Sequence, residues 1–198
     1  MRLERIGGGV AAVALAALLS IPSSAQAAGR IKKRAENQQD RIAQGVKSGQ
    51  LTAGETARLE RKETRLNGEV RDMRQVDGGK LTAQDKAVVN QQQNRLSKNI
   101  YGQKHDGQTQ GQGTGEVAQR KENQQDRIAQ GVQSGQLTAG EAARLETKES
   151  AVNHETRDMR ALDGGKLTPK DKAAVNQQQN QLSRDIYGQK HDAQTQPQ

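Results

Sequence analysis

The sequence contains no cysteine, phenylalanine or tryptophan, and only two of its 198 residues are tyrosine. Without cysteine the chain has no disulfides, no thiol chemistry and no thiolate metal ligands. With so few aromatic side chains it also lacks a platform on which nucleic-acid bases stack. Hydrophobic residues make up only 31% of the chain, so we expect a thin core packed from aliphatic side chains.

Long apolar runs are scarce too, and the clearest one covers residues 10–21. Two arginines precede this run, and small residues follow it up to Ala27. This order of basic, apolar and small segments predicts a secretory signal peptide over residues 1–27, cleaved near Ala27. The run has about half of the ~20 residues that a membrane span needs. We therefore expect a periplasmic or secreted bacterial protein with no transmembrane span after processing.

The rest of the chain is a tandem duplication, because residues 35–110 match residues 121–196 at 58 of 76 positions without a gap. We expect two helical repeat domains joined by a flexible linker rich in Gly, Gln and Thr, and followed by a disordered tail. The predicted boundaries are 30–101 for the first domain, 102–119 for the linker, 120–187 for the second domain and 188–198 for the tail.

A short unit, Gly-x-Leu-Thr-x-x-Glu/Asp, occurs twice in each copy. Its glycine suits the left-handed position that ends a helix, and its leucine faces inward. The threonine is an N-cap, and the acid three residues later completes a capping box. Pro169, directly after Thr168, fits the first position of such a helix. The predicted capping residues are Gly49, Leu51, Thr52, Gly79, Leu81, Thr82, Gly135, Leu137, Thr138, Gly165, Leu167 and Thr168.

Between these turns the spacing of apolar residues predicts three helices per copy, over about 31–46, 53–76 and 83–101 in the first copy. The fold class is therefore all-α, with two tandem three-helix domains. Along the second helix the acids Glu60, Glu63 and Glu69 alternate with Arg58, Lys62 and Arg65. This alternation predicts a solvated, salt-bridged helix face.

The four units resemble the second half of an EF-hand loop, with its turn glycine, its apolar pairing residue and its terminal acid. The resemblance implies paired helix–loop–helix modules, with Leu51 beside Leu81 and Leu137 beside Leu167. The chain departs from the EF-hand pattern at the first ligand positions, which hold Gln44, Val46 and Ser48 in the first loop. In pattern the chain is also similar to small exported bacterial proteins of unassigned function, and its Leu-Thr helix starts resemble those of the Spy/CpxP-type periplasmic chaperones.

No cofactor is expected apart from a divalent cation, for which the acids of the four units and a His-Asp pair in each copy are candidate ligands. One His per copy is too few for a closed site, and a capped turn or a solvated tail explains the same residues. No nucleophile, base and orienting group can be assembled, so we do not expect an enzyme. The candidate metal ligands are Glu55, Asp85, Glu141, Asp171, His105, Asp106, His191 and Asp192.

The net charge of +8 is unevenly distributed. Residues 30–110 carry 17 basic and 10 acidic side chains, whereas residues 116–198 carry 12 of each. Nucleic acid is therefore not the expected partner, because only one copy is basic and stacking aromatics are lacking. The basic cluster of Arg30, Lys32, Lys33 and Arg34 is a candidate for contact with an anionic surface.

An amide-rich run, residues 90–94 and again residues 176–180, could bind a partner helix or an extended peptide, or form a wet helix face. A protein or an envelope polymer is the expected partner. The sequence thus predicts an exported, non-catalytic helical repeat protein with a binding or structural role in the bacterial envelope. A chaperone-like envelope stress protein and a divalent-cation-binding protein are the two alternatives.

Overall fold

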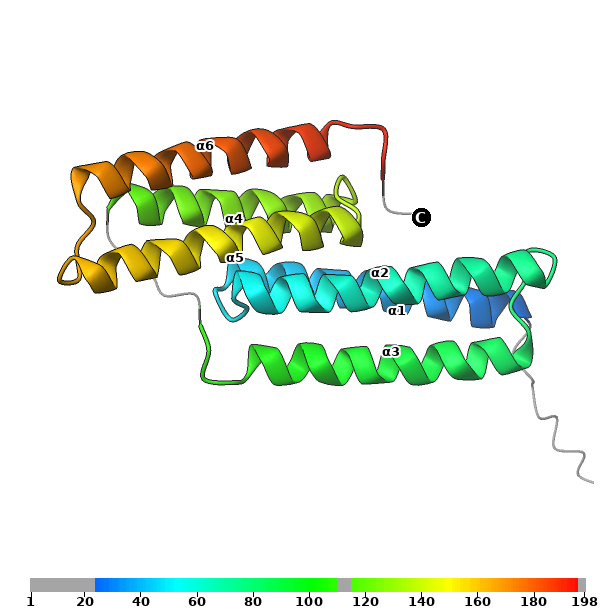
Figure 1. Ribbon diagram of the computed structural model, residues 1–198. Coiled ribbons are helices and arrows are strands. Elements are labelled where there is room, and N and C mark those ends of the chain that lie inside the picture. The colour runs from blue at the N-terminus through cyan, green and yellow to red at the C-terminus, as the bar shows by residue number, and fades with distance from the viewer. Residues whose placement is uncertain (1–23, 110–114, 196–198) are drawn as a thin grey trace, which may run out of the picture.

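The computed structural model describes residues 24–109 and 115–195, which form six α-helices and no strand (Figure 1). This confirms the all-α prediction. Residues 1–23 of the predicted signal peptide lie outside the described residues. In the described part, none of the helices combines the length and hydropathy of a membrane span. The helices are α1 (Ser24–Lys47), α2 (Ala53–Val76), α3 (Ala83–Lys104), α4 (Glu116–Ser134), α5 (Ala139–Leu162) and α6 (Pro169–Lys190).

The helices of each copy run up, down and up beside one another. In the first copy α1 and α3 contact each other directly, through Gln38 to the Gln93 carbonyl and, nearer the ends of both helices, through Lys104 to Gln44. These two helices are therefore parallel, and α2 runs antiparallel to both (Figure 1). The two turns therefore lie at opposite ends of α2 (Figure 1). A helix of 24 residues is about 36 Å long. The pairing of Leu51 with Leu81, and of Leu137 with Leu167, that the EF-hand resemblance implies is consequently wrong.

The joints between the helices form as the sequence predicts. All four glycines of the repeated unit have positive φ, between 70° and 88°, which is the left-handed region that favours glycine. All four threonines accept a hydrogen bond from the backbone N–H of the acid three residues on, and all four capping boxes are complete. Pro169 is the first residue of α6. Leu51, Leu81 and Leu137 are buried, and Leu167 is half-buried.

Several helices extend beyond their predicted ends. Gly102 does not stop α3, which continues to Lys104, and α6 likewise continues to Lys190. Because α4 also begins early, at Glu116, about one helical turn occupies each end of the predicted linker, which is shorter than expected. At the other end of the chain α1 begins at Ser24, inside the predicted signal peptide. The predicted boundaries follow caps and apolar residues, whereas a polar helix can continue until another donor bonds its last carbonyls.

The two copies pack against each other around a single hydrophobic core. Helix α2 lies against α5 and α1 against α4, while α3 and α6 lie on the two outer sides (Figure 1). A methyl group added at Gly54 would meet Ser150 Oγ at 3.3 Å, and one at Gly140 would meet Thr64 Cγ2 at 3.7 Å. Gly140 is the equivalent of Gly54, and Ser150 is the equivalent of Thr64, so the same contact occurs twice with the copies interchanged. The copies are therefore related by an approximate two-fold axis, and α2 and α5 are antiparallel.

Close packing also explains a glycine inside each first helix. A Cβ at Gly45 would lie 2.6 Å from Leu51 Cδ1, and one at Gly131 would lie 2.6 Å from Leu137 Cδ1. In addition, the Leu51 backbone N–H donates to the Gly45 carbonyl at 3.0 Å. The leucine of each joint therefore folds back onto the preceding helix, and only glycine leaves room for it.

Candidate functional site

The four acids predicted as metal ligands lie in four capping boxes. Glu55 Oε2 accepts from the Thr52 backbone N–H and from Thr52 Oγ1, both at 2.8 Å. Asp85 Oδ2 accepts the corresponding bonds from Thr82 at 2.8 and 2.6 Å. Glu141 and Asp171 repeat this arrangement in the second copy. Each carboxylate thus binds its own helix start, and the turns of one copy are separated by the length of a helix.

The two His-Asp pairs lie where their helices end, as the sequence predicts. The His105 Nδ1–H donates to the Tyr101 carbonyl at 2.7 Å, and the two rings stack with centroids 4.1 Å apart. Asp106 Oδ1 accepts from the Gln108 backbone N–H at 2.9 Å. His191 and Asp192 make the same contacts in the second copy. In the described part of the chain, no three His, Asp or Glu side chains gather as a metal site requires.

The amide-rich runs are partly internal. Gln93 is buried, and its Nε2 donates to the Ile31 carbonyl at 2.9 Å while its own carbonyl accepts from Gln38 Nε2 at 2.7 Å. Gln179 and Gln124 form the equivalent contacts in the second copy. The centre of each run therefore joins the third helix of a copy to the first, and the partner helix of these amides belongs to the same chain.

Four buried glutamates form a cluster where α2 meets α5, and sequence reasoning placed two of them wrongly. Glu60 and Glu63 are fully buried rather than part of a solvated face, as are their equivalents Glu146 and Glu149. Glu60 Oε2 accepts from Gln39 Nε2 at 3.1 Å. Neither carboxylate oxygen of Glu63 has a hydrogen-bond partner among the described residues. The helix repeat places these acids on the side of α2 that the second copy covers, which the sequence of one helix cannot show.

Burial raises the pKa of every member of this cluster. It raises the pKa of Glu60 to about 8, with a hydrogen bond from Gln39 opposing and the charge of Glu63 adding to the effect. Burial alone raises the pKa of Glu63 to about 7. The pKa of Glu149 is also about 7, where burial is opposed by Lys121 and Asn153. Burial likewise holds the pKa of Glu146 well above its ordinary value. The cluster is therefore largely neutral in mildly acidic solution and gains charge near neutrality.

The two halves of the cluster differ in one cation. Lys121 on α4 lies half-buried near Glu149 and favours its ionised form. The equivalent position in the first copy is Ala35, so Glu63 has no such neighbour. The cluster is thus symmetric in its acids and asymmetric in its counter-charge.

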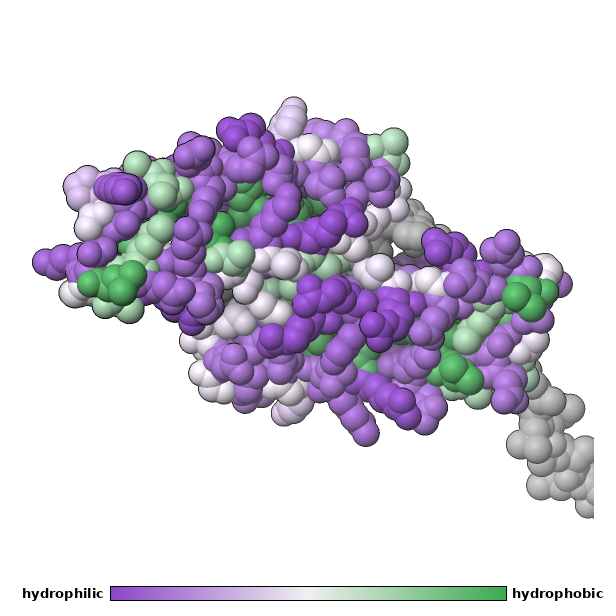
Figure 2. Space-filling view, viewed as in Figure 1, coloured by the Kyte–Doolittle hydropathy of each residue, from purple (hydrophilic) through white to green (hydrophobic). Residues whose placement is uncertain are grey.

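A basic face covers α2 and the neighbouring part of α3 in the first copy. We define it as the exposed side chains of Arg58, Arg61, Lys62, Arg65, Arg95 and Lys98. Strongly hydrophilic side chains gather over this region in Figure 2. Among the described residues, none of the six cations forms an ion pair with a carboxylate. The second copy weakens the same face, with Thr147, Ala151 and Gln181 in place of Arg61, Arg65 and Arg95.

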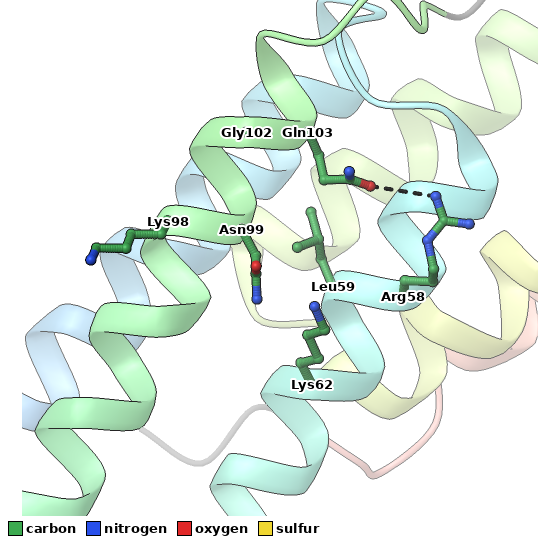
Figure 3. Close-up of a pocket in the computed structure, with 7 residues that line it drawn as sticks. All are labelled: Arg58, Leu59, Lys62, Lys98, Asn99, Gly102 and Gln103. Carbon is green, nitrogen blue, oxygen red and sulfur yellow. Dashed lines mark hydrogen bonds between the residues drawn. The ribbon is translucent and has the colours of Figure 1, made fainter.

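A groove lies between α2 and α3 within the basic face, and its equivalent lies between α5 and α6. The first groove has a volume of about 230 Å³ and is lined by Arg58, Leu59, Lys62, Lys98, Asn99, Gly102 and Gln103 (Figure 3). The second has a volume of about 260 Å³ and is lined by Arg144, Leu145, Lys148, Arg184, Asp185, Gly188 and Gln189. Asp185 is the only acid in either lining, and it pairs with Lys148 at 2.7 Å.

Comparison of the chain with family models, curated proteins and solved structures gives no match. A site assignment therefore depends on the geometry of the chain itself. The sequence already located the charge excess in one copy. It did not locate the basic face. The spacing of the basic residues between positions 58 and 65 would, however, have placed them on one side of α2.

Proposed function

We propose that this chain is an exported, non-catalytic binding protein of the bacterial envelope, which uses the basic face of its first copy to bind an anionic envelope component. The single observation that carries this proposal is the location of three of the cations that only the first copy has. Three arginines that the second copy replaces by neutral residues, Arg61, Arg65 and Arg95, lie on the same face. Basic residues that served solubility alone would not need to lie on the same face of the molecule.

The fold supports a binding role in a second way. Gln92 on α3 donates to Glu69 on α2, and α2 packs along α3, so the cations of the basic face stand on two helices that are held together. The basic residues Arg30 and Lys32 of α1 are exposed as well and would add a peripheral contact, whereas Lys33 pairs with Glu36 at 3.2 Å. Cations that are exposed and lack carboxylate partners attract polyanions at long range and release bound counterions on contact.

The test is capture of anionic material from a solubilised envelope fraction by the immobilised chain. The test variant carries Arg61→Thr, Arg65→Ala and Arg95→Gln together, which are the residues that the second copy places at these positions. We expect the wild-type chain to retain anionic polymer that salt releases, and the variant to retain no more than about a third of it. Captured material is assayed for phosphate, acidic sugar and protein.

The matched control is Lys47→Gln, which also writes a residue of the second copy into the first but lies at the end of α1. This control should bind like the wild type. Equal capture by the wild type and the triple variant, or capture of neutral material only, would contradict the proposal.

The two alternatives have less geometric support. A chaperone needs a broad exposed apolar surface, whereas the large apolar side chains exposed among the described residues are Val76, Tyr101, Leu162 and Tyr187, each near a helix end. Divalent-cation binding through the capping acids would have only one carboxylate at each turn, and one of its oxygens already accepts from a threonine. Aggregation assays with an unfolded client, and calorimetry with calcium, zinc and copper, test these alternatives directly.

A further inference from the structure

The groove between α2 and α3 is lined by hydrogen-bond donors from both helices (Figure 3). In Figure 3 Lys62 and Asn99 point toward one another across the groove, while Lys98 points away from it. Leu59, which is 1% exposed, closes the floor. Arg58 borders the groove and donates only a long bond of 3.4 Å, to Gln103 Oε1. Among the described residues Lys62 has no ion pair, so the groove has donors and no acceptor that neutralises them.

The second groove contains the acceptor that the first one lacks. Asp185 stands at the position of Asn99, and its Oδ2 accepts from Lys148 Nζ at 2.7 Å while its Oδ1 accepts from Gln181 Nε2 at 2.9 Å. The same backbone geometry thus places an anionic oxygen against the lysine of the groove. In the first copy, replacing this carboxylate by the neutral amide of Asn99 leaves the equivalent place open to an external anion.

We propose that the groove lined by Arg58, Lys62, Asn99 and Gln103 is a binding site for one phosphate group of a linear phosphate polymer. This inference rests on the proposed function and names its ligand class. An ammonium and an amide that point toward one another, with a guanidinium at the border of the same groove (Figure 3), suit a phosphate, which has several acceptor oxygens. The neighbouring arginines of the basic face continue along α2 for about 10 Å between residues 58 and 65, so further phosphate groups of the same polymer reach cations.

Two other sources of phosphate fit the face less well. A lipid surface normally also takes apolar anchors, and the large exposed apolar side chains of the described residues lie at helix ends outside the groove. A nucleic acid would gain from stacking its bases, but neither tyrosine lines the groove. A phosphate polymer without bases needs only the cations and donors that the face presents.

The test is isothermal titration calorimetry of the whole chain with inorganic polyphosphate of defined length. Asn99→Asp supplies the first groove with the acid of the second, and Asp185→Asn removes it from the second. Both changes are nearly isosteric, so folding should be preserved, and thermal melts monitored by circular dichroism verify this. We expect Asn99→Asp to weaken binding about tenfold, because it neutralises Lys62 and repels the phosphate. We expect Asp185→Asn to add a second binding site.

Net charge is controlled by the pair Lys47→Gln and Gln133→Lys, which change the charge by the same amounts at equivalent exposed positions outside the grooves. Each should alter the affinity less than about twofold at 0.15 M salt. Polyglutamate, single-stranded oligothymidylate and phosphatidylglycerol vesicles are titrated under the same conditions. We expect each of them to bind more weakly than polyphosphate.

No binding of polyphosphate, or an equal effect of Asn99→Asp and Lys47→Gln, overturns the groove site. Tighter binding of vesicles, oligothymidylate or polyglutamate than of polyphosphate overturns the ligand class. If the arginine variant still loses envelope material while polyphosphate fails to bind, this inference falls and the proposed function stands. If the arginine variant loses nothing, both fall.

Discussion

The two copies of this chain share one backbone plan and carry different surfaces. Their turns, caps, buried glutamates and internal amides correspond residue by residue, down to similar distances in each capping box. Their exposed charges do not correspond, because the first copy keeps a basic face that the second has largely lost. Duplication therefore preserved the residues that hold the helices and left the outer face able to diverge. Variants that exchange residues between the copies test which differences matter.

The largest expected effect concerns the buried glutamates, through Glu63→Gln and its match Glu149→Gln. The pKa of Glu63 is about 7 in the folded chain against 4.5 for an ordinary glutamate. As pH rises through this window the unfolded chain loses its proton first, so the free energy of unfolding falls, on the order of 3 kcal/mol for this group. Below about pH 4.5 both states are protonated and the penalty vanishes.

Denaturant unfolding at pH 5 and pH 8 measures this effect. We expect Glu63→Gln to stabilise the chain at pH 8 by roughly 2 kcal/mol and to change little at pH 5. Glu149→Gln should act in the same direction with a smaller net gain, because the neutral amide leaves Lys121 without the carboxylate beside it. A wild-type stability that is constant or rises between pH 5 and pH 8 would contradict the burial of this cluster.

A middle-sized effect concerns a feature that both copies share, the N-cap threonine. We expect Thr52→Ala and Thr138→Ala to lower the free energy of unfolding equally, by about 1 to 2 kcal/mol each, since each change removes the cap from a helix start and leaves a buried acid short of a donor. Thr52→Ser, which keeps the hydroxyl, is the control. Unequal losses, beyond experimental error, would mean that the two caps are not equivalent in the two copies.

The smallest effect concerns the cation that only the second copy has beside the cluster. Ala35→Lys places a lysine in the first copy where Lys121 stands in the second, and we expect a gain of about 1 kcal/mol or less at pH 8. Lys121→Ala should cost a similar amount. Both changes should fade at pH 5, where Glu63 and Glu149 are neutral, and a gain that persists there would indicate packing instead of charge.

Most of the local structure could be predicted from the sequence, because local signals specify it. The unit containing Gly49, Leu51 and Thr52 encodes a left-handed stop, an inward leucine and a capped start within a few residues. The boundaries at Gly102 and Glu116 could not be predicted as well. Where no sequence signal marks a helix end, the end depends on which nearby donor bonds the last backbone carbonyls. Here the His105 backbone N–H donates to the Gly102 carbonyl.

The candidate sites were less predictable than the fold. The capping acids and the His-Asp pairs were found as residues, but their role as ligands stays a prediction. The buried cluster was missed because Glu60 and Glu63 have the same spacing as a solvated ion-pair ladder. The grooves were missed because Lys62 and Asn99 are 37 positions apart in sequence and meet only when α3 packs on α2.

The sequence by itself determined the helices, their turns and the duplication, since each depends on contacts between residues close in the chain or on direct repetition. Only the tertiary structure decided which side of each helix meets the other copy, and hence which charges are buried and which face outward. The reason is that a helix has the same local hydrogen bonds on every side. The environment of a glutamate on its surface is set by what packs there, and in this chain the duplicate copy packs there.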